Sequence, residues 1–281
     1  MTQSAARIPT ALLGLCFAAA GALAQSGAER GRLEFTVHVT PESGRTEAAR
    51  GLTIFLLSKS FRDIRREAEE KTPPPDLNAF VDGLRFGPEL KAWMKQNRTV
   101  TLTGDEFHSR LSPDDLFRIP EFLDAYVNSN LSGLNQGFPK PKYNAEDRTL
   151  NPQKYETNRK LYEIQLRKYL ALHPDSKDGM DSILNQVDPT NAWVAEVARR
   201  RERVRASALE TVQTDYLAAK TETNLDGRGA FEAAPGAYWL STIEGEALGG
   251  DLHLRWDVSV EVRAGAVTRV ELTNLNAEKK P

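Results

Sequence analysis

Apolar and polar residues alternate near the N-terminus in the way that is typical of a half-buried β-strand. Every second residue of this segment is apolar: Leu33, Phe35, Val37 and Val39. Residues 52–57 are apolar almost throughout, as expected of a strand that is buried on both faces. A turn-forming sequence at 41–44 separates the two segments. Residues 31–58 are therefore predicted to form β-strands.

Residues 59–208 have a different pattern, which is rich in charge and places apolar residues three or four positions apart. The pair Ser112-Pro113 predicts a helix start, because serine caps an N-terminus and proline suits the first helical position. The pair Asn151-Pro152 predicts the start of the longest helix. We expect this block to be mostly α-helical.

A strand pattern returns from about Thr211 and continues almost to the C-terminus. The alternation of apolar and polar residues is clearest around Val258, Val260 and Val262. Gly265 then marks a turn before a last strand at 267–272.

Strands near both ends and helices between them predict an α+β protein. In it an antiparallel β-sandwich, formed by residues 31–58 and 209–277, is interrupted by a helical insertion at 59–208. The alternative is a pair of separate β-domains around a helical one. We reject it because two strands alone do not form a stable sheet in water.

Residues 1–24 have the pattern of a secretory signal peptide. Arg7 supplies a positive charge, residues 11–22 are apolar, and a small-x-small motif predicts cleavage near Ala24. The apolar run is shorter than the roughly 20 residues that span a bilayer, and no later segment is long and apolar enough. We expect a secreted or periplasmic protein without a membrane span.

The only cysteine, Cys16, lies inside this signal segment. A lipid-anchored protein would have a small residue before the cysteine, and Leu15 stands there instead, so cleavage is favoured over lipidation. The mature chain would then have no cysteine, which excludes disulfides and thiol catalysis.

The chain carries 37 basic and 39 acidic residues. This near balance gives no global electrostatic reason to bind nucleic acid or an anionic membrane. The densest basic segment, residues 199–205, is interpreted as the solvated face of a helix. A patch for an anionic envelope polymer is the alternative.

No catalytic, metal-binding or cofactor motif is found. The four histidines, at positions 38, 108, 173 and 253, are scattered, and none begins a His-Glu-x-x-His motif. Residues 175–181 resemble a calcium loop but lack two of its acidic ligands, so we predict a turn between helices, with a weak calcium site as the alternative. The sequence also lacks a Gly-x-Ser-x-Gly elbow and a glycine-rich phosphate loop.

Three segments resemble the carboxypeptidase regulatory-like domain: Asn224-Leu-Asp-Gly-Arg-Gly-Ala-Phe231, Pro235-Gly-Ala-Tyr-Trp-Leu240 and Val260-Glu-Val-Arg-Ala-Gly265. The shared pattern is an Asp-Gly turn, a short strand with an aromatic residue, a Pro-Gly turn, and a strand with tyrosine. The resemblance implies a transthyretin-like (prealbumin-like) sandwich, which is a carbohydrate-binding-like fold. It also implies a non-catalytic module. The long helical insertion departs from the compact family pattern.

Aromatic residues are the predicted binding residues. Tyr238 and Leu240 are expected to face the core, so Trp239 between them points to the opposite face of the strand. There it would be exposed to a ligand or would anchor the insertion. Trp193 and Phe138, in the helical block, are the other two candidates.

We therefore expect a secreted, non-catalytic envelope protein that binds a glycan or another envelope protein. The runner-up is a hydrolase with a site between the helical insertion and the sandwich. Converging carboxylates, or an acid beside His108 or His173, would favour it. A third interpretation is an architectural subunit.

Overall fold

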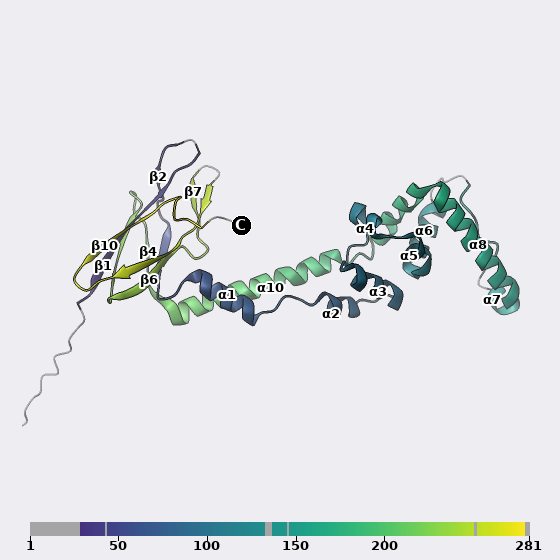
Figure 1. Cartoon of the computed structure of the whole chain (residues 1–281), viewed down its shortest axis with the longest axis horizontal. Coiled ribbons are helices and arrows are strands. Elements are labelled where there is room, and N and C mark those ends of the chain that lie inside the picture. The colour runs from purple at the N-terminus through teal and green to yellow at the C-terminus, as the bar shows by residue number, and fades with distance from the viewer. Residues whose placement is uncertain (1–28, 43, 133–136, 145, 250–251, 279–281) are drawn as a thin grey trace, which may run out of the picture. The chain divides into compact units, whose positions relative to one another are not determined.

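The computed structural model describes residues 29–42, 44–132, 137–144, 146–249 and 252–278. The chain divides into two compact units (Figure 1). The β unit comprises the described residues up to Ser60 and those from Leu217 onward, and the helical unit is Phe61–Tyr216. The predicted signal segment 1–24, with its cleavage site near Ala24, lies outside the described residues.

The β unit is built from short strands. They are β1 (Gly31–Val39), β2 (Glu47–Ala48), β3 (Thr53–Leu57), β4 (Leu217–Glu222), β5 (Arg228–Ala233), β6 (Gly236–Ser241), β7 (Ala247–Gly249), β8 (Leu252–Leu254), β9 (Asp257–Val262) and β10 (Val267–Leu272). Together with the helices below, they confirm the predicted mixed α+β class.

Strand β1 is the centre of the first sheet. It pairs with β5 and β2 in antiparallel fashion and with β10 in parallel, with Phe35 opposite Gly229 on one side and Val270 on the other. The parallel pair differs from the antiparallel arrangement that the sequence predicts. Parallel neighbours need a long connection, and nearly the whole chain lies between these two strands.

The second sheet has the strand order β4-β3-β6-β9, and β7 and β8 form a separate hairpin. All of these pairs are antiparallel. Leu57 at the end of β3 lies opposite Leu217 at the start of β4. The chain therefore leaves this sheet and returns to it on adjacent strands.

Both sheets contribute to one cluster of buried side chains. The alternating residues of β1 are buried as predicted, and they pack with apolar residues of β3, β5, β6, β9 and β10. Phe35 and Phe231 stack with their ring centroids 5.5 Å apart. Trp256 is also buried, and its indole N–H donates to the carbonyl of Thr273 at 2.9 Å.

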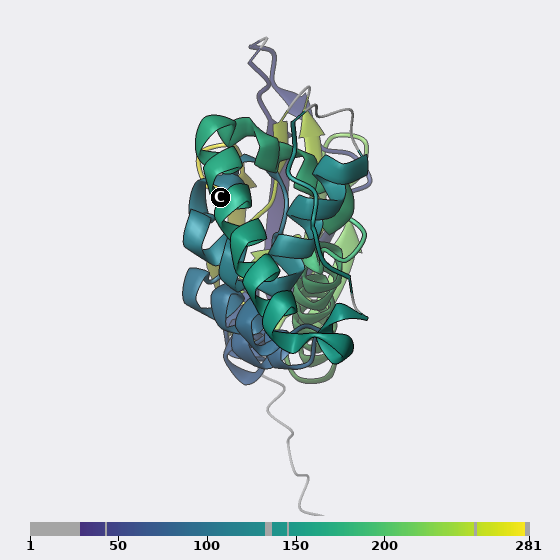
Figure 2. The ribbon, with the colours of Figure 1, turned by 90° about the vertical axis from the view of Figure 1, so that its right-hand side faces the viewer.

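The helical unit consists of helices of very different length (Figures 1 and 2). They are α1 (Phe61–Lys71), α2 (Leu77–Asp82), α3 (Pro88–Asn97), α4 (Gly104–Arg110), α5 (Pro113–Arg118), α6 (Pro120–Ser132), α7 (Asp147–Leu150), α8 (Pro152–Leu172), the 3₁₀ helix η1 (Pro174–Met180), α9 (Asp181–Leu184), α10 (Thr190–Thr211) and the π-helical turn η2 (Val212–Tyr216).

Two predicted helix starts are confirmed by their caps. The Ser112 hydroxyl accepts the backbone N–H of Asp115 at 3.1 Å, and the Asn151 side chain accepts that of Lys154 at 3.3 Å. Among the described helices the longest is α10 with 22 residues rather than α8 with 21. The return to strand structure also comes later than expected, at Leu217.

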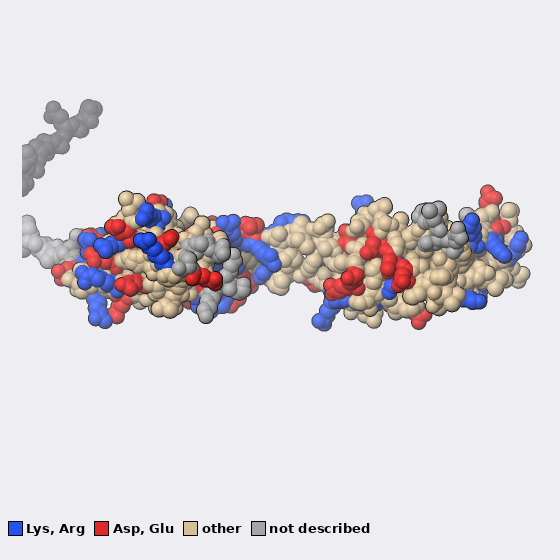
Figure 3. Space-filling view, turned by 90° about the horizontal axis from the view of Figure 1, so that it is seen from above, with Lys and Arg blue, Asp and Glu red and all other residues tan. Residues whose placement is uncertain are grey.

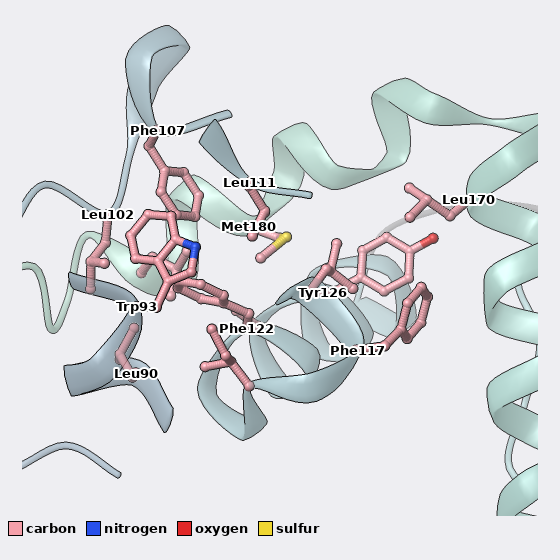
Figure 4. Close-up of a cluster of buried hydrophobic side chains, with 14 of the residues drawn as sticks. Leu90, Trp93, Leu102, Phe107, Leu111, Phe117, Phe122, Tyr126, Leu170 and Met180 are labelled. Atoms are coloured by element: carbon pink, nitrogen blue, oxygen red, sulfur yellow. The ribbon is translucent and has the colours of Figure 1, made fainter. Parts of the chain in front are cut away.

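Aromatic side chains fill the centre of the helical unit (Figure 4). Trp93 makes edge contacts with Phe107 and Phe122, at centroid distances of 5.7 and 5.2 Å. Tyr126 lies edge-on to Phe117 at 6.2 Å. This core contains no residue of the β unit, so each unit has a core of its own.

The charged surface is mixed in sign. On the face seen in Figure 3, basic and acidic side chains are interspersed over the described residues. Within the predicted basic run on α10, Arg199 pairs with Glu196 at 3.0 Å, whereas Arg200 is half-buried and donates to the carbonyl of Thr72 at 2.9 Å. Within the described chain, no helix is both long and apolar enough to cross a bilayer.

Candidate functional site

The structure places Trp239 on β6, half-buried and opposite Leu57 of β3 and Ser259 of β9. Its neighbour Leu240 is buried in the core of the β unit, and Tyr238 packs against that core. Trp239 therefore points to the other face of the sheet, as the alternation predicts.

The other two predicted residues belong to the helical unit. Phe138 is only 7% exposed, and its ring lies edge-on to those of Tyr126 and Tyr169. Trp193 is half-buried against the same core and contacts the ring of Phe80 at 5.1 Å. Their contacts give both side chains a packing role.

A groove of about 350 Å³ in the helical unit brings together side chains that the sequence analysis did not single out. We call it the tyrosine groove. It is lined by Leu123, Asp124, Val127, Pro141, Tyr143, Asn144, Tyr155, Arg159, Tyr162, Glu163 and Leu166. The α8 residues among them recur every three or four positions, so they share one side of that helix.

Three tyrosines form the aromatic part of the tyrosine groove. Tyr143 precedes α7 and lies edge-on to both Tyr155 and Tyr162 of α8, at centroid distances of 5.2 and 5.9 Å. Tyr143 and Tyr155 are half-buried, so parts of their rings remain exposed. This arrangement combines apolar ring surface with phenolic hydroxyls.

The hydroxyl of Tyr162 is unusual because it is buried and has no hydrogen-bond partner among the described residues. The whole residue is 7% exposed. A buried polar group without a partner costs roughly 1–3 kcal/mol, so most such groups are paired with protein, water or a ligand.

Burial raises the pKa of Tyr162 to about 12, with smaller contributions from Tyr143 and Tyr126. Burial also raises the pKa of Tyr143, as does Tyr155, while Arg159 acts in the opposite direction. Both phenols are therefore neutral at neutral pH. They can donate and accept hydrogen bonds, but neither is a ready general base.

Some of the charged side chains of the tyrosine groove are held by ion pairs, and one is not. Arg159 pairs with Glu156 at 3.1 Å, and Glu163 pairs with Arg167 at 3.1 Å. Asp124 is exposed on α6 and makes no ion pair within the described part of the chain. Aromatic rings beside planar carboxylate, amide and guanidinium groups suit a ligand with both an apolar face and many hydroxyls.

His108 does have an acid beside it. Its Nε2 lies 2.8 Å from Asp181 Oδ1, and Asp181 Oδ2 accepts the backbone N–H of Gly104 at 3.0 Å. The other ring nitrogen, Nδ1, is buried without a partner in the described structure. Neither His108 nor Asp181 lines the tyrosine groove. The contact ties α4 to the start of α9.

His173 contacts the ring of Tyr169 at a centroid distance of 4.5 Å. Residues 175–181, for which a turn between helices was predicted, form most of the 3₁₀ helix η1 and the start of α9. Among the residues that the structure describes, no group of three or more His, Cys, Asp or Glu could hold a metal ion.

No protein-family model, curated protein or solved structure matches this chain.

Sequence reasoning missed the tyrosines because each one alone resembles a core residue. A usable signal was present, since Tyr155 and Tyr162 are seven residues apart on α8 and therefore lie on the same side of it. The contribution of Tyr143 comes from a loop, and only the folded structure brings it to that helix face.

Proposed function

We propose that the protein is a secreted, non-catalytic envelope protein that binds a carbohydrate in the tyrosine groove. The observation that carries this proposal is the buried Tyr162 hydroxyl, which has no hydrogen-bond partner among the residues that the structure describes. A sugar hydroxyl that reaches it would supply the missing hydrogen bond. The apolar face of the sugar ring would pack on the exposed parts of Tyr143 and Tyr155.

The polar groups of the tyrosine groove also favour a carbohydrate ligand. Asp124 can accept hydrogen bonds from sugar hydroxyls, and Arg159 and Asn144 can donate them. The volume of about 350 Å³ is at the lower end of the roughly 300–1,000 Å³ of small-molecule sites. It suits one or two sugar rings of a longer chain.

In this proposal the β unit is a scaffold. Its two sheets, which share one core, support the transthyretin-like sandwich that the resemblance to the carboxypeptidase regulatory-like domain implies. Trp239 remains the proposed contact of the β unit with an envelope partner.

The test is calorimetric titration of the mature protein with soluble oligosaccharides, followed by Tyr162→Phe. Removing the hydroxyl is expected to weaken binding by about tenfold, because one buried hydrogen bond is lost. Stability at neutral pH should be kept or increased, since an unpaired polar group is removed.

Tyr169→Phe is the matched control, because Tyr169 lies on α8 but does not line the tyrosine groove. It should bind like the wild type. The proposal fails if no oligosaccharide binds, or if Tyr162→Phe and Tyr169→Phe bind equally well.

One observation favours a second candidate, a glycoside hydrolase. Asp124 and Glu163 line the same groove, and a pair of carboxylates is the usual machinery for cleaving glycosidic bonds. Release of reducing ends from an oligosaccharide, lost in Asp124→Asn, would support this candidate. Binding without release would favour the non-catalytic proposal.

A further inference from the structure

A second groove lies in the helical unit and shares no residue with the tyrosine groove. It has a volume of about 290 Å³ and is formed by α5, the end of α8 and η1. Its walls consist of Leu111, Ser112, Pro113, Leu116, Phe117, Arg167, Leu170, Ala171, Pro174 and Lys177. Most of these side chains are apolar and none is acidic, so we call it the apolar groove.

One of its two cations is neutralised and fixed. The Arg167 guanidinium lies 4.5 Å from the centre of the Phe117 ring and pairs with Asp114 at 2.9 Å and Glu163 at 3.1 Å. Burial is the largest single influence on the pKa of Arg167 and lowers it, but the hydrogen bonds and charges of Asp114 and Glu163 together raise this pKa above its ordinary value. Arg167 therefore stays charged, and its contacts hold its side chain in place in the wall of the groove.

The second cation is not neutralised. The Lys177 ammonium donates to the backbone carbonyl of His108 at 3.2 Å, and no carboxylate pairs with it among the described residues. The side chain is half-buried, so its charge is only partly solvated. The single polar hydroxyl of the groove, on Ser112, is already bonded to Asp115.

We propose that the apolar groove binds a fatty-acid carboxylate of medium chain length. The hydrocarbon chain would pack on Leu116, Phe117 and Leu170, and the carboxylate would pair with Lys177. The unpaired ammonium selects an anionic head group over a neutral or cationic one. The small volume favours a single short chain over a phospholipid with two long ones.

Calorimetric titration of the mature protein with octanoate, decanoate and decyltrimethylammonium, each below its micelle concentration, tests this proposal. Decanoate is expected to bind at least tenfold more tightly than decyltrimethylammonium, which has the same chain and the opposite charge. Octanoate should bind more weakly than decanoate by roughly fourfold for each methylene that it lacks.

Two variants locate the binding site. Lys177→Met is expected to weaken decanoate binding at least tenfold, while Lys168→Met, a matched change on the exposed side of α8, should have no effect. Ala171→Glu places a carboxylate in the groove wall from an exposed position, so it should abolish binding without disturbing the core.

The proposal is overturned if decanoate does not bind, or if decyltrimethylammonium binds as tightly. It is also overturned if Lys177→Met and Lys168→Met behave alike, since the carboxylate would then not lie at Lys177. Circular dichroism of each variant shows whether a loss of binding comes from unfolding.

Discussion

Gly229 on β5 lies directly against the ring of Phe35 in the neighbouring strand. A Cβ atom at this position would be 2.3 Å from Phe35 Cζ, far closer than van der Waals contact. The ring cannot move away easily, because Phe35 is 2% exposed and stacks on Phe231.

We expect Gly229→Ala to lower the free energy of unfolding by about 1–3 kcal/mol, as overpacked core positions do. Gly236→Ala is the matched control, because its Cβ would meet Tyr238 at an ordinary 3.5 Å. It should be neutral or slightly stabilising. Urea unfolding measures both, and equal midpoints for the two variants would contradict the expected clash.

Tyr162 should make stability depend on pH in the alkaline range. Its ordinary pKa is 10.0 and burial raises it to about 12, so the unfolded chain loses this proton first as the pH rises. The native state then binds more protons than the unfolded state, and stability falls between about pH 10 and 12. Below pH 10 Tyr162 is protonated in both the folded and the unfolded state, and its contribution to stability is fully present.

Urea unfolding of wild type and Tyr162→Phe at pH 8, 10.5 and 11.5 measures this effect. The wild type should lose more stability than the variant between pH 8 and 11.5. Parallel losses in the two proteins would show that the phenol ionises equally easily in the folded and unfolded states.

At the residue scale the sequence predicted burial better than it predicted the site. The alternating residues of β1 are buried as expected, because a period of two fixes which face of a strand they occupy. The tyrosine groove was not foreseen, since it depends on a loop residue, Tyr143, meeting a helix that begins nine residues later.

At the element scale the helix starts were predictable wherever a side chain caps the backbone. Asp76, Ser112 and Asn151 each accept a backbone N–H at the start of α2, α5 and α8. The end of α10 was not predicted correctly. The buried stripe of Val204 and Ala208 on α10 continues to Val212 of η2, so the helical period runs on through residues whose types also suit a strand.

We expect Ser112→Ala to cost about 1 kcal/mol of stability, because the first turn of α5 loses the acceptor for the Asp115 N–H. Ser109→Ala is a suitable control, since Ser109 donates to a carbonyl inside α4 and caps no helix start. Thermal unfolding followed by circular dichroism compares the two. A loss of the same size in Ser109→Ala would contradict the expectation that the cap of α5 at Ser112 stabilises the protein.

At the scale of the whole molecule, composition and pattern predicted the mixed α+β class. They did not reveal that β1 and β10 are parallel, because strand direction depends on where the chain returns and not on the residues of either strand.

The position of the helical unit in the chain, between β3 and β4, has a testable consequence. Leu57 and Leu217 are paired neighbours, so a short linker can replace everything between Ser60 and Leu217.

The shortened protein, with residues 61–216 replaced by a few glycines and serines, is expected to fold into the β unit. Its buried cluster contains no residue of the helical unit, and its strands pair only with one another. Cooperative unfolding and a strand-type circular dichroism spectrum would support this expectation. A disordered product would show that the strands need the helices in order to assemble.

The central position of β1 also sets the order of assembly during synthesis. Its partners β5 and β10 are made after the entire helical unit, and β10 is completed only at Leu272. Until then the edges of β1 are unsatisfied and able to pair with other chains. A chain that stops before Val267 would have complete helices and a sheet that lacks β10, so a deletion that removes β10 should promote aggregation more than other deletions of the same length.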